Sequence, residues 1–260
     1  MSDFTSEHVP STTAIIAKKS RKILFMSALV LALGGLGSLP AYAQNWDLQT
    51  QLELGAVITT GNTEDENIRF KGQFIAAREQ WSYLLSAEGF RSSKNDVLAA
   101  QRLYTVGSAT YNYDLSNFVM TRIAHEDDRF SGYDGQTDFS VSYGQELLRN
   151  RSNMTWQYTV GAGMRTSRES GPLGEDFSEA IVRLSTDYTW DLSDNARFIQ
   201  SLGVDIGEET TIARSETAVE SDIMSNLSMK FGVKVKHQTE VPVLREKTDT
   251  EFAATLLLRF

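Results

Sequence analysis

The sequence contains no cysteine, and this absence is the first constraint on its chemistry. Without cysteine the chain forms no disulfide and offers no thiolate to a metal ion. An excess of basic charge is also absent, since 34 acidic residues outnumber 25 lysines and arginines. Nucleic-acid phosphates are bound by basic surfaces, so this composition argues against a nucleic-acid partner. Nothing in the sequence predicts a cofactor or a metal site.

Long apolar runs are scarce, and the one near the N-terminus has the features of a signal peptide. It extends from Ile23 to about Leu36 and follows a basic group formed by Lys18, Lys19, Arg21 and Lys22. The small residues Ala41 and Ala43 then fit a signal-peptidase site, which makes Gln44 the first residue of the mature chain. The alternative is a membrane anchor, but the run is shorter than the roughly 20 residues that a spanning helix needs.

Cleavage would divide the chain into a signal peptide at residues 1–43 and a single domain at residues 44–260. The removed segment carries four basic and two acidic residues, so the net charge falls from −9 to −11. Charged residues interrupt every later candidate for a spanning helix. If the mature chain crosses a membrane, only a closed β-barrel satisfies all of its backbone hydrogen bonds.

The mature chain alternates polar and apolar residues with a period of two, in segments of about ten residues. One segment places Ile68, Phe70 and Phe74 opposite Arg69 and Lys71. We predict an all-β fold, a closed antiparallel transmembrane barrel of about 12 strands preceded by a cleaved signal peptide. The strands are expected near residues 46–58, 66–77, 81–91, 99–113, 118–126, 137–148, 154–165, 177–190, 196–207, 213–224, 227–237 and 248–260. In the fourth segment, residues 99–113, both faces carry aromatic residues. Only the charge of Arg102 indicates that the even-numbered positions face inward.

The two ends of this barrel differ in sequence. Alternate connections are short turns, whereas the intervening ones are mostly longer and more charged, as periplasmic turns and extracellular loops are. All four tryptophans fall at the turn end, and Phe118, Phe198 and Phe260 fall at the same level. Indole prefers a membrane interface, so we predict an interfacial role for Trp46, Trp81, Trp156 and Trp190. A soluble barrel such as a lipocalin would bury these side chains.

The final strand alternates to a terminal phenylalanine. Its apolar face includes Phe252, Leu256, Leu258 and Phe260. This pattern resembles the strand that the barrel-assembly machinery binds by strand addition, and we predict that these residues form an assembly signal.

The predicted lumen is rich in charges of both signs. Lys230, Lys234 and Lys236 lie between acidic residues of the two flanking strands, where opposite charges pair across the ladder. A barrel of this size falls between side-chain-filled eight-stranded barrels and open porins. The sequence therefore predicts a narrow or partly occluded lumen.

No catalytic residue is predicted. Only His125 and His237 remain in the mature chain, and the odd position of His125 points it toward lipid. The acidic residues beside His125 are interpreted as a solvated rim, which could bind divalent cations between lipopolysaccharides.

Several motifs give the chain a family resemblance over essentially its whole mature length. They are Gly61-Asn62-Thr63, Tyr113-Asp114-Leu115-Ser116, Tyr143-Gly144, Lys247-Thr248-Asp249-Thr250 and a predicted loop formed by Glu126, Asp127, Asp128, Arg129, Phe130, Ser131, Gly132 and Tyr133. The chain resembles the domain-of-unknown-function family 481, also called YdiY-like salt-induced outer-membrane proteins. The resemblance implies an outer-membrane barrel associated with salt stress, and it implies no catalytic residues. Within the loop, Ser131 and Gly132 would form the turn.

Three hypotheses for the function follow. The leading one is a structural or osmotic-adaptation barrel in the outer membrane of a Gram-negative bacterium, exported through the Sec pathway. The second is a narrow channel for ions or small solutes, and the third is an outer-membrane hydrolase that uses His125. The expected partners are outer-membrane lipid, lipopolysaccharide and, during insertion, the barrel-assembly machinery, while the oligomeric state is not predicted.

Overall fold

The computed structural model describes residues 46–60, 66–94, 97–128, 131–170, 174, 176–242 and 245–260. Side chains are described for these residues except 57–60, 66–67, 91–94 and 97–100. The predicted signal peptide and its cleavage residues Ala41, Ala43 and Gln44 lie outside this part of the chain, as do Arg129 and Phe130. Among the described residues, no helix is long and apolar enough to cross a membrane.

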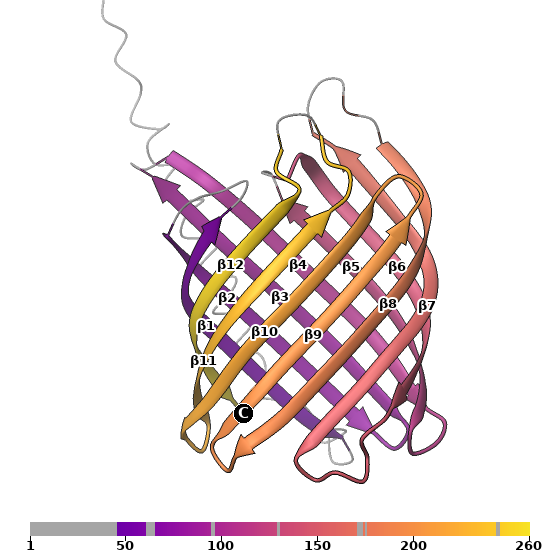
Figure 1. The fold of residues 1–260 in the computed structure, drawn as a ribbon, viewed down its shortest axis with the longest axis vertical. Helices are drawn as coiled ribbons and strands as arrows, with labels where there is room; N and C mark the ends of the chain where they lie inside the picture. The colour runs from indigo at the N-terminus through magenta and orange to yellow at the C-terminus, as the bar shows by residue number, and fades with distance from the viewer. Residues whose placement is uncertain are drawn as a thin grey trace, which may run out of the picture. The chain divides into compact units, whose positions relative to one another are not determined.

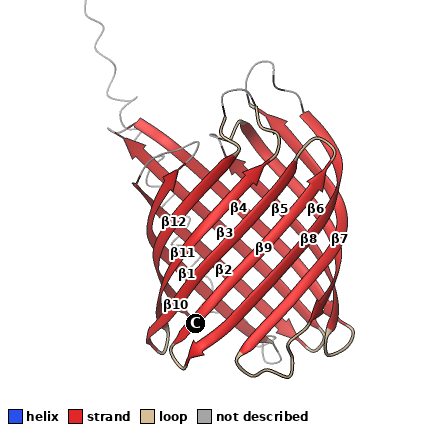
Figure 2. Ribbon diagram, viewed as in Figure 1, coloured by secondary structure: helices blue, strands red, loops and turns tan. Residues whose placement is uncertain are grey.

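Twelve antiparallel strands form one closed barrel, as the alternation predicts (Figures 1 and 2). Each strand pairs with its neighbours in sequence, and the first and last strands close the ring. The strands are β1 (Asp47–Thr60), β2 (Glu66–Arg78), β3 (Trp81–Lys94), β4 (Val97–Asn112), β5 (Asn117–Asp128), β6 (Tyr133–Glu146), β7 (Met154–Glu169), β8 (Asp176–Ser193), β9 (Ala196–Gly207), β10 (Thr211–Met224), β11 (Leu227–Gln238) and β12 (Thr248–Arg259).

The outer face is apolar and the inner face is polar, so the barrel inverts the usual order of a water-soluble protein. Outward side chains such as Leu54, Leu85 and Phe231 are more than half exposed. Inward side chains such as Glu53, Arg165 and Ser140 are buried. In β4 the even residues, Arg102 among them, line the lumen, as expected.

Two junctions of the barrel carry inward glycines that leave no room for a side chain. A Cβ on Gly163 of β7 would lie 1.9 Å from the carbonyl oxygen of Phe139 on β6. A Cβ on Gly55 of β1 would lie 2.3 Å from the carbonyl oxygen of Ala254 on β12. Glycine kinks allow a sheet to bend sharply, and the two junctions are separated by six strands in either direction around the ring. The barrel therefore has two opposite corners joined by two walls, β1–β6 and β7–β12, which cross each other in Figure 1.

The tryptophans lie where the sequence places them. Trp81 begins β3, Trp156 and Trp190 lie near the turn ends of β7 and β8, and Trp46 directly precedes β1. Phe118 lies at the same level, near the start of β5, but its ring is buried against Gly144 on the inner face. Gly144 has no side chain, and this leaves space inside the barrel for an aromatic ring. The interfacial role of the tryptophans stays a prediction.

Candidate functional site: the charged lumen

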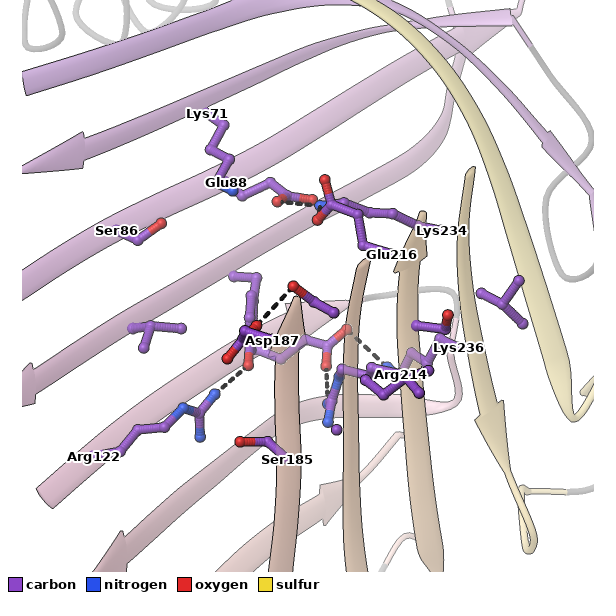
Figure 3. A pocket seen from close by; sticks show the side chains of 18 of the residues that line it. Lys71, Ser86, Glu88, Arg122, Ser185, Asp187, Arg214, Glu216, Lys234 and Lys236 are labelled. Carbon is purple, nitrogen blue, oxygen red and sulfur yellow. Dashed lines mark hydrogen bonds and ion pairs between the residues drawn. The ribbon is translucent and has the colours of Figure 1, made fainter. Parts of the chain in front are cut away.

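The centre of the lumen contains a connected network of four cations and four carboxylates. Arg69 and Arg102 both contact Glu88 and Glu251, with distances from 2.5 to 3.9 Å. Lys234 lies 2.7 Å from Glu88 and 3.4 Å from Glu216 (Figure 3). The network is completed by Lys230 with Glu216 and Glu53. Glu216 pairs with lysines of the next strand, which confirms the predicted ladder. Arg69 and Arg102 also pair with Glu88 of a neighbouring strand, whereas the contacts with Glu251, the contact of Lys234 with Glu88 and that of Lys230 with Glu53 skip at least one strand.

Glu126 is the centre of a second group of charges. Its two carboxylate oxygens accept from Lys236 at 2.7 Å and from Arg214 at 3.0 Å. Arg214 also donates to Asp205, which accepts from Arg183. The predicted solvated rim is therefore wrong for Glu126, whose carboxylate is buried in the lumen. β5 continues through Asp128 instead of ending at Glu126, and this keeps the carboxylate on the inner face.

Several of these ion pairs join strands that are far apart around the ring. Glu126 lies on β5 and Lys236 on β11, six strands away in both directions. A round barrel of this strand number, with strands about 4.8 Å apart and tilted by about 40°, would be about 24 Å across. Extended lysine and glutamate side chains joined end to end span only about 13 Å between their Cα atoms. The lumen is therefore flattened, and the two walls meet through their charged side chains.

We call the seven residues at the meeting of the walls the charged belt. The belt comprises Glu88, Arg102, Glu126, Arg214, Lys234, Lys236 and Glu251. Both members of nearly every pair are less than one fifth exposed, so solvent screens them weakly. Loss of a single partner would leave a buried charge uncompensated. The belt crosses the lumen with contacts that can separate without disrupting an apolar core.

A polar cavity of about 360 Å³ lies against the belt. Its lining includes every residue of the belt and continues toward the turn end through polar residues such as Gln73, Ser108 and Asp187. Figure 3 shows Lys71, Glu88 and Lys234 on one side of this space and Arg122 and Ser185 on another. Arg122 is fixed by Asp138 and by the hydroxyl of Tyr104. The cavity therefore has a charged, hydrogen-bonded lining suited to polar solutes.

Loops from opposite walls also meet above the lumen. The backbone of Gly132, between β5 and β6, lies against Pro242 and Arg245, between β11 and β12. Gly132 has φ of +90°, which a residue with a side chain rarely adopts, and its carbonyl accepts from the amide of Ser170 at 3.0 Å. The Ser131 hydroxyl donates to the carbonyl of Asp128 at 3.0 Å, as expected for a turn at Ser131 and Gly132. This contact joins loops of the two walls at the loop end of the barrel.

The histidine candidates lie on the outer face. His125 is exposed and its Nδ1 lies 2.8 Å from the hydroxyl of Thr137, while the neighbouring Glu126 points inward. His237 makes the equivalent contact with Thr248. Neither imidazole faces the cavity. Among the residues that the structure describes, no group of three or more His, Asp and Glu side chains could hold a metal ion.

Sequence reasoning identified the charged inner face but not the pairing across the lumen. The missed residues are Glu88, Arg69, Arg122, Arg183, Arg214 and Asp205. Period-two alternation places each of them inside, but it carries no information on which strands face each other. The inward glycines at the two corners were the available signal.

Comparisons with known proteins agree with this architecture. The chain is 23% identical over 203 residues to "Uncharacterized protein YdiY" of Escherichia coli (strain K12), covering 78% of this chain and 79% of that protein. It matches the NanC porin structure with a TM-score of 0.56 and 7% identity, covering 80% of this chain and 98% of that one. It matches the translocator domain of the autotransporter NalP from Neisseria meningitidis with a TM-score of 0.52 and 9% identity, covering 96% and 100%.

These structural likenesses support a barrel fold of the outer-membrane type. The family model described as "Protein of unknown function, DUF481" matches residues 52–260, which is most of the chain. The family resemblance inferred from the motifs is confirmed, and the protein belongs to the DUF481 family.

Proposed function

We propose that the protein is a narrow outer-membrane channel for small polar solutes that is closed at rest by the charged belt. The observation that carries this proposal is the polar cavity of about 360 Å³ bounded by cross-lumen ion pairs. Apolar residues of similar volume often stabilise a protein as well as a buried ion pair does, or better. A barrel with a purely structural role would therefore gain little from a charged cavity, whereas a channel needs a polar path and a separable closure.

The outer-membrane location is part of the same proposal. The exposed apolar outer face requires lipid, and the matched porin and translocator domain are barrels of this kind. Residues 1–43 would direct Sec export and be removed, and the β12 residues Phe252, Leu256, Leu258 and Phe260 would be bound by the assembly machinery. Lipid and lipopolysaccharide would then surround the barrel.

Conductance in planar lipid bilayers tests the proposal. We expect the wild-type protein to show rare, small openings and Glu126→Gln to raise the time-averaged conductance several-fold, because Lys236 and Arg214 lose their shared partner. Glu240→Gln is the matched control, since Glu240 pairs with Lys247 in an exposed loop. Conductance indistinguishable from that of bare bilayers in all three proteins would overturn the channel.

The second candidate is a structural or osmotic-adaptation barrel with a permanently closed lumen. The belt itself favours this second candidate. The ion pair of Glu126 with Lys236, which lies six strands away, holds the two walls together. The bilayer experiment separates the two functions. A hydrolase is not proposed, because His125 faces away from the lumen and from its acidic neighbour Glu126.

A further inference from the structure

One lysine in the cavity has no hydrogen-bond or ion-pair partner among the described residues. Lys71 of β2 lines the cavity, yet it makes no hydrogen bond or ion pair with any residue that the structure describes. Figure 3 shows its side chain beside Glu88, which already contacts Arg69, Arg102 and Lys234. A buried ammonium group has three donors, and leaving them without acceptors is costly.

Lys71 is not a member of the adjacent ion-pair network. The adjacent network is balanced, because its four cations are matched by its four carboxylates. Lys71 is additional to this set, although Glu53 and Glu88 of the network lie opposite it on the neighbouring strands, and Asp187 and Asp249 also line the cavity. Its ammonium group therefore has carboxylates nearby but no direct acceptor among the described residues, and an anion entering from solution would supply one.

A second observation also points to a missing acceptor. Arg183 lines the same cavity, and its Nε is buried without a hydrogen-bond partner, although Nη1 donates to Asp205. The Nε of Arg69, a member of the network, is likewise buried without a hydrogen-bond partner. Cationic N–H groups bind carboxylate and phosphate oxygens with shorter and stronger hydrogen bonds than they make to neutral acceptors.

The opposite wall places an acidic side chain in the same cavity. Asp187 of β8 lines the cavity and makes no ion pair with the described residues, but its oxygens accept from Ser201 at 2.7 Å and from Gln157 at 3.3 Å. Its hydrogen-bonding capacity is therefore largely used by the protein. Its charge would repel an anion, so Asp187 would set an upper limit on anion affinity.

We propose that the cavity is a binding site for a small solute that carries an oxyanion, either a carboxylate or a phosphate, with Lys71 as its principal contact. This inference rests on the proposed channel and names the class of solute that the channel holds. A cavity of about 360 Å³ is large enough to admit a monosaccharide-sized solute.

Isothermal titration calorimetry of the full mature barrel in detergent micelles tests the site with three probes. D-Glucuronate and D-glucose have the same ring and differ in one carboxylate, and inorganic phosphate is the third probe. We expect glucuronate to bind roughly tenfold or more tightly than glucose. Equal affinity for the two sugars, or binding of neither sugar together with no binding of phosphate, would overturn the proposal. Phosphate binding with the same dependence on Lys71 would assign the site to oxyanions in general. Glucuronate binding without phosphate binding would assign it to carboxylates alone.

Four variants locate the site. Lys71→Met should lower glucuronate affinity roughly tenfold without changing glucose binding, and Lys71→Arg should retain most of the affinity. Asp187→Asn should raise glucuronate affinity about twofold to threefold, because it removes a like charge without changing shape. This gain cannot result from misfolding. Lys247→Gln, in an exposed loop, is the matched control. Glucuronate binding that is unchanged in both Lys71→Met and Asp187→Asn would refute the site.

The two proposals fail separately. Binding that depends on Lys71, together with silent bilayers for the wild-type protein and Glu126→Gln, would support the site and overturn the channel. Conductance that rises in Glu126→Gln while glucuronate and phosphate do not bind would support the channel and overturn the site.

Discussion

The corners and the walls of this barrel are built from opposite kinds of residue. At the corners the inward positions are glycines, such as Gly55 and Gly163, where neighbouring backbones leave no room for a Cβ. Along the walls the inward positions are long charged side chains, such as Glu126 and Lys236. Because the corners absorb the curvature, the walls lie close enough for their charges to meet. The small residues thus determine how the large ones interact.

The largest expected effect comes from filling a corner. Gly163→Ala would place a methyl group 1.9 Å from the carbonyl oxygen of Phe139, so the backbones of β6 and β7 must separate. We expect a loss of about 4 kcal/mol in the free energy of unfolding, measured by urea titration in detergent micelles.

The control for this change is an inward glycine of a wall. A Cβ on Gly203 of β9 would meet only Arg183, at an ordinary 3.9 Å. Gly203→Ala should therefore change the unfolding free energy by only about 0.5 kcal/mol. Equal losses in the two variants would show that curvature is not concentrated at the corners.

Breaking the belt should have the next largest effect. Glu126→Gln leaves Lys236 and Arg214 buried without their carboxylate, and we expect a loss of about 3 kcal/mol in unfolding free energy. The exposed pair of Glu240 and Lys247 gives the comparison, because Glu240→Gln should cost about 0.5 kcal/mol or less. If water separated the charges of the two walls, Glu126→Gln and Glu240→Gln would lower the unfolding free energy by similar amounts.

The smallest effect is expected at the turn end, far from the belt. In the turn between β4 and β5, the side-chain amide of Asn117 and the backbone amides of Ser116 and Asn117 hold the pKa of the Asp114 carboxyl below its usual range. A lowered folded-state pKa gives stability that is complete above the unfolded value of about 3.9 and is lost as pH falls through the folded value.

Comparison of Asp114→Ala with the wild type therefore gives a pH-dependent difference. The variant should unfold at a slightly lower urea concentration at pH 7, and the difference should shrink as the pH falls below about 4. A difference that stays constant down to pH 2 would mean that the carboxylate charge does not stabilise the turn.

Much of the barrel could be predicted from alternation alone, because its outer face requires apolar side chains and its inner face polar ones. The twelve strands and the inward side of β4 follow from that pattern. The burial of the Phe118 ring was not predicted, because it depends on the space left by Gly144 on a neighbouring strand. Glu126 was misplaced for a related reason, since an acidic run beside a loop has the same local pattern whether it is solvated or paired with β10 and β11.

A double-mutant cycle of Glu126→Gln and Lys236→Met measures the central claim, that the two walls meet through the belt. The residues lie six strands apart, so a round barrel would keep them out of contact. We predict a coupling of about 1 kcal/mol or more in the unfolding free energy, as found for residues in direct contact. Effects of the two substitutions that add to within about 0.5 kcal/mol would contradict the flattened lumen.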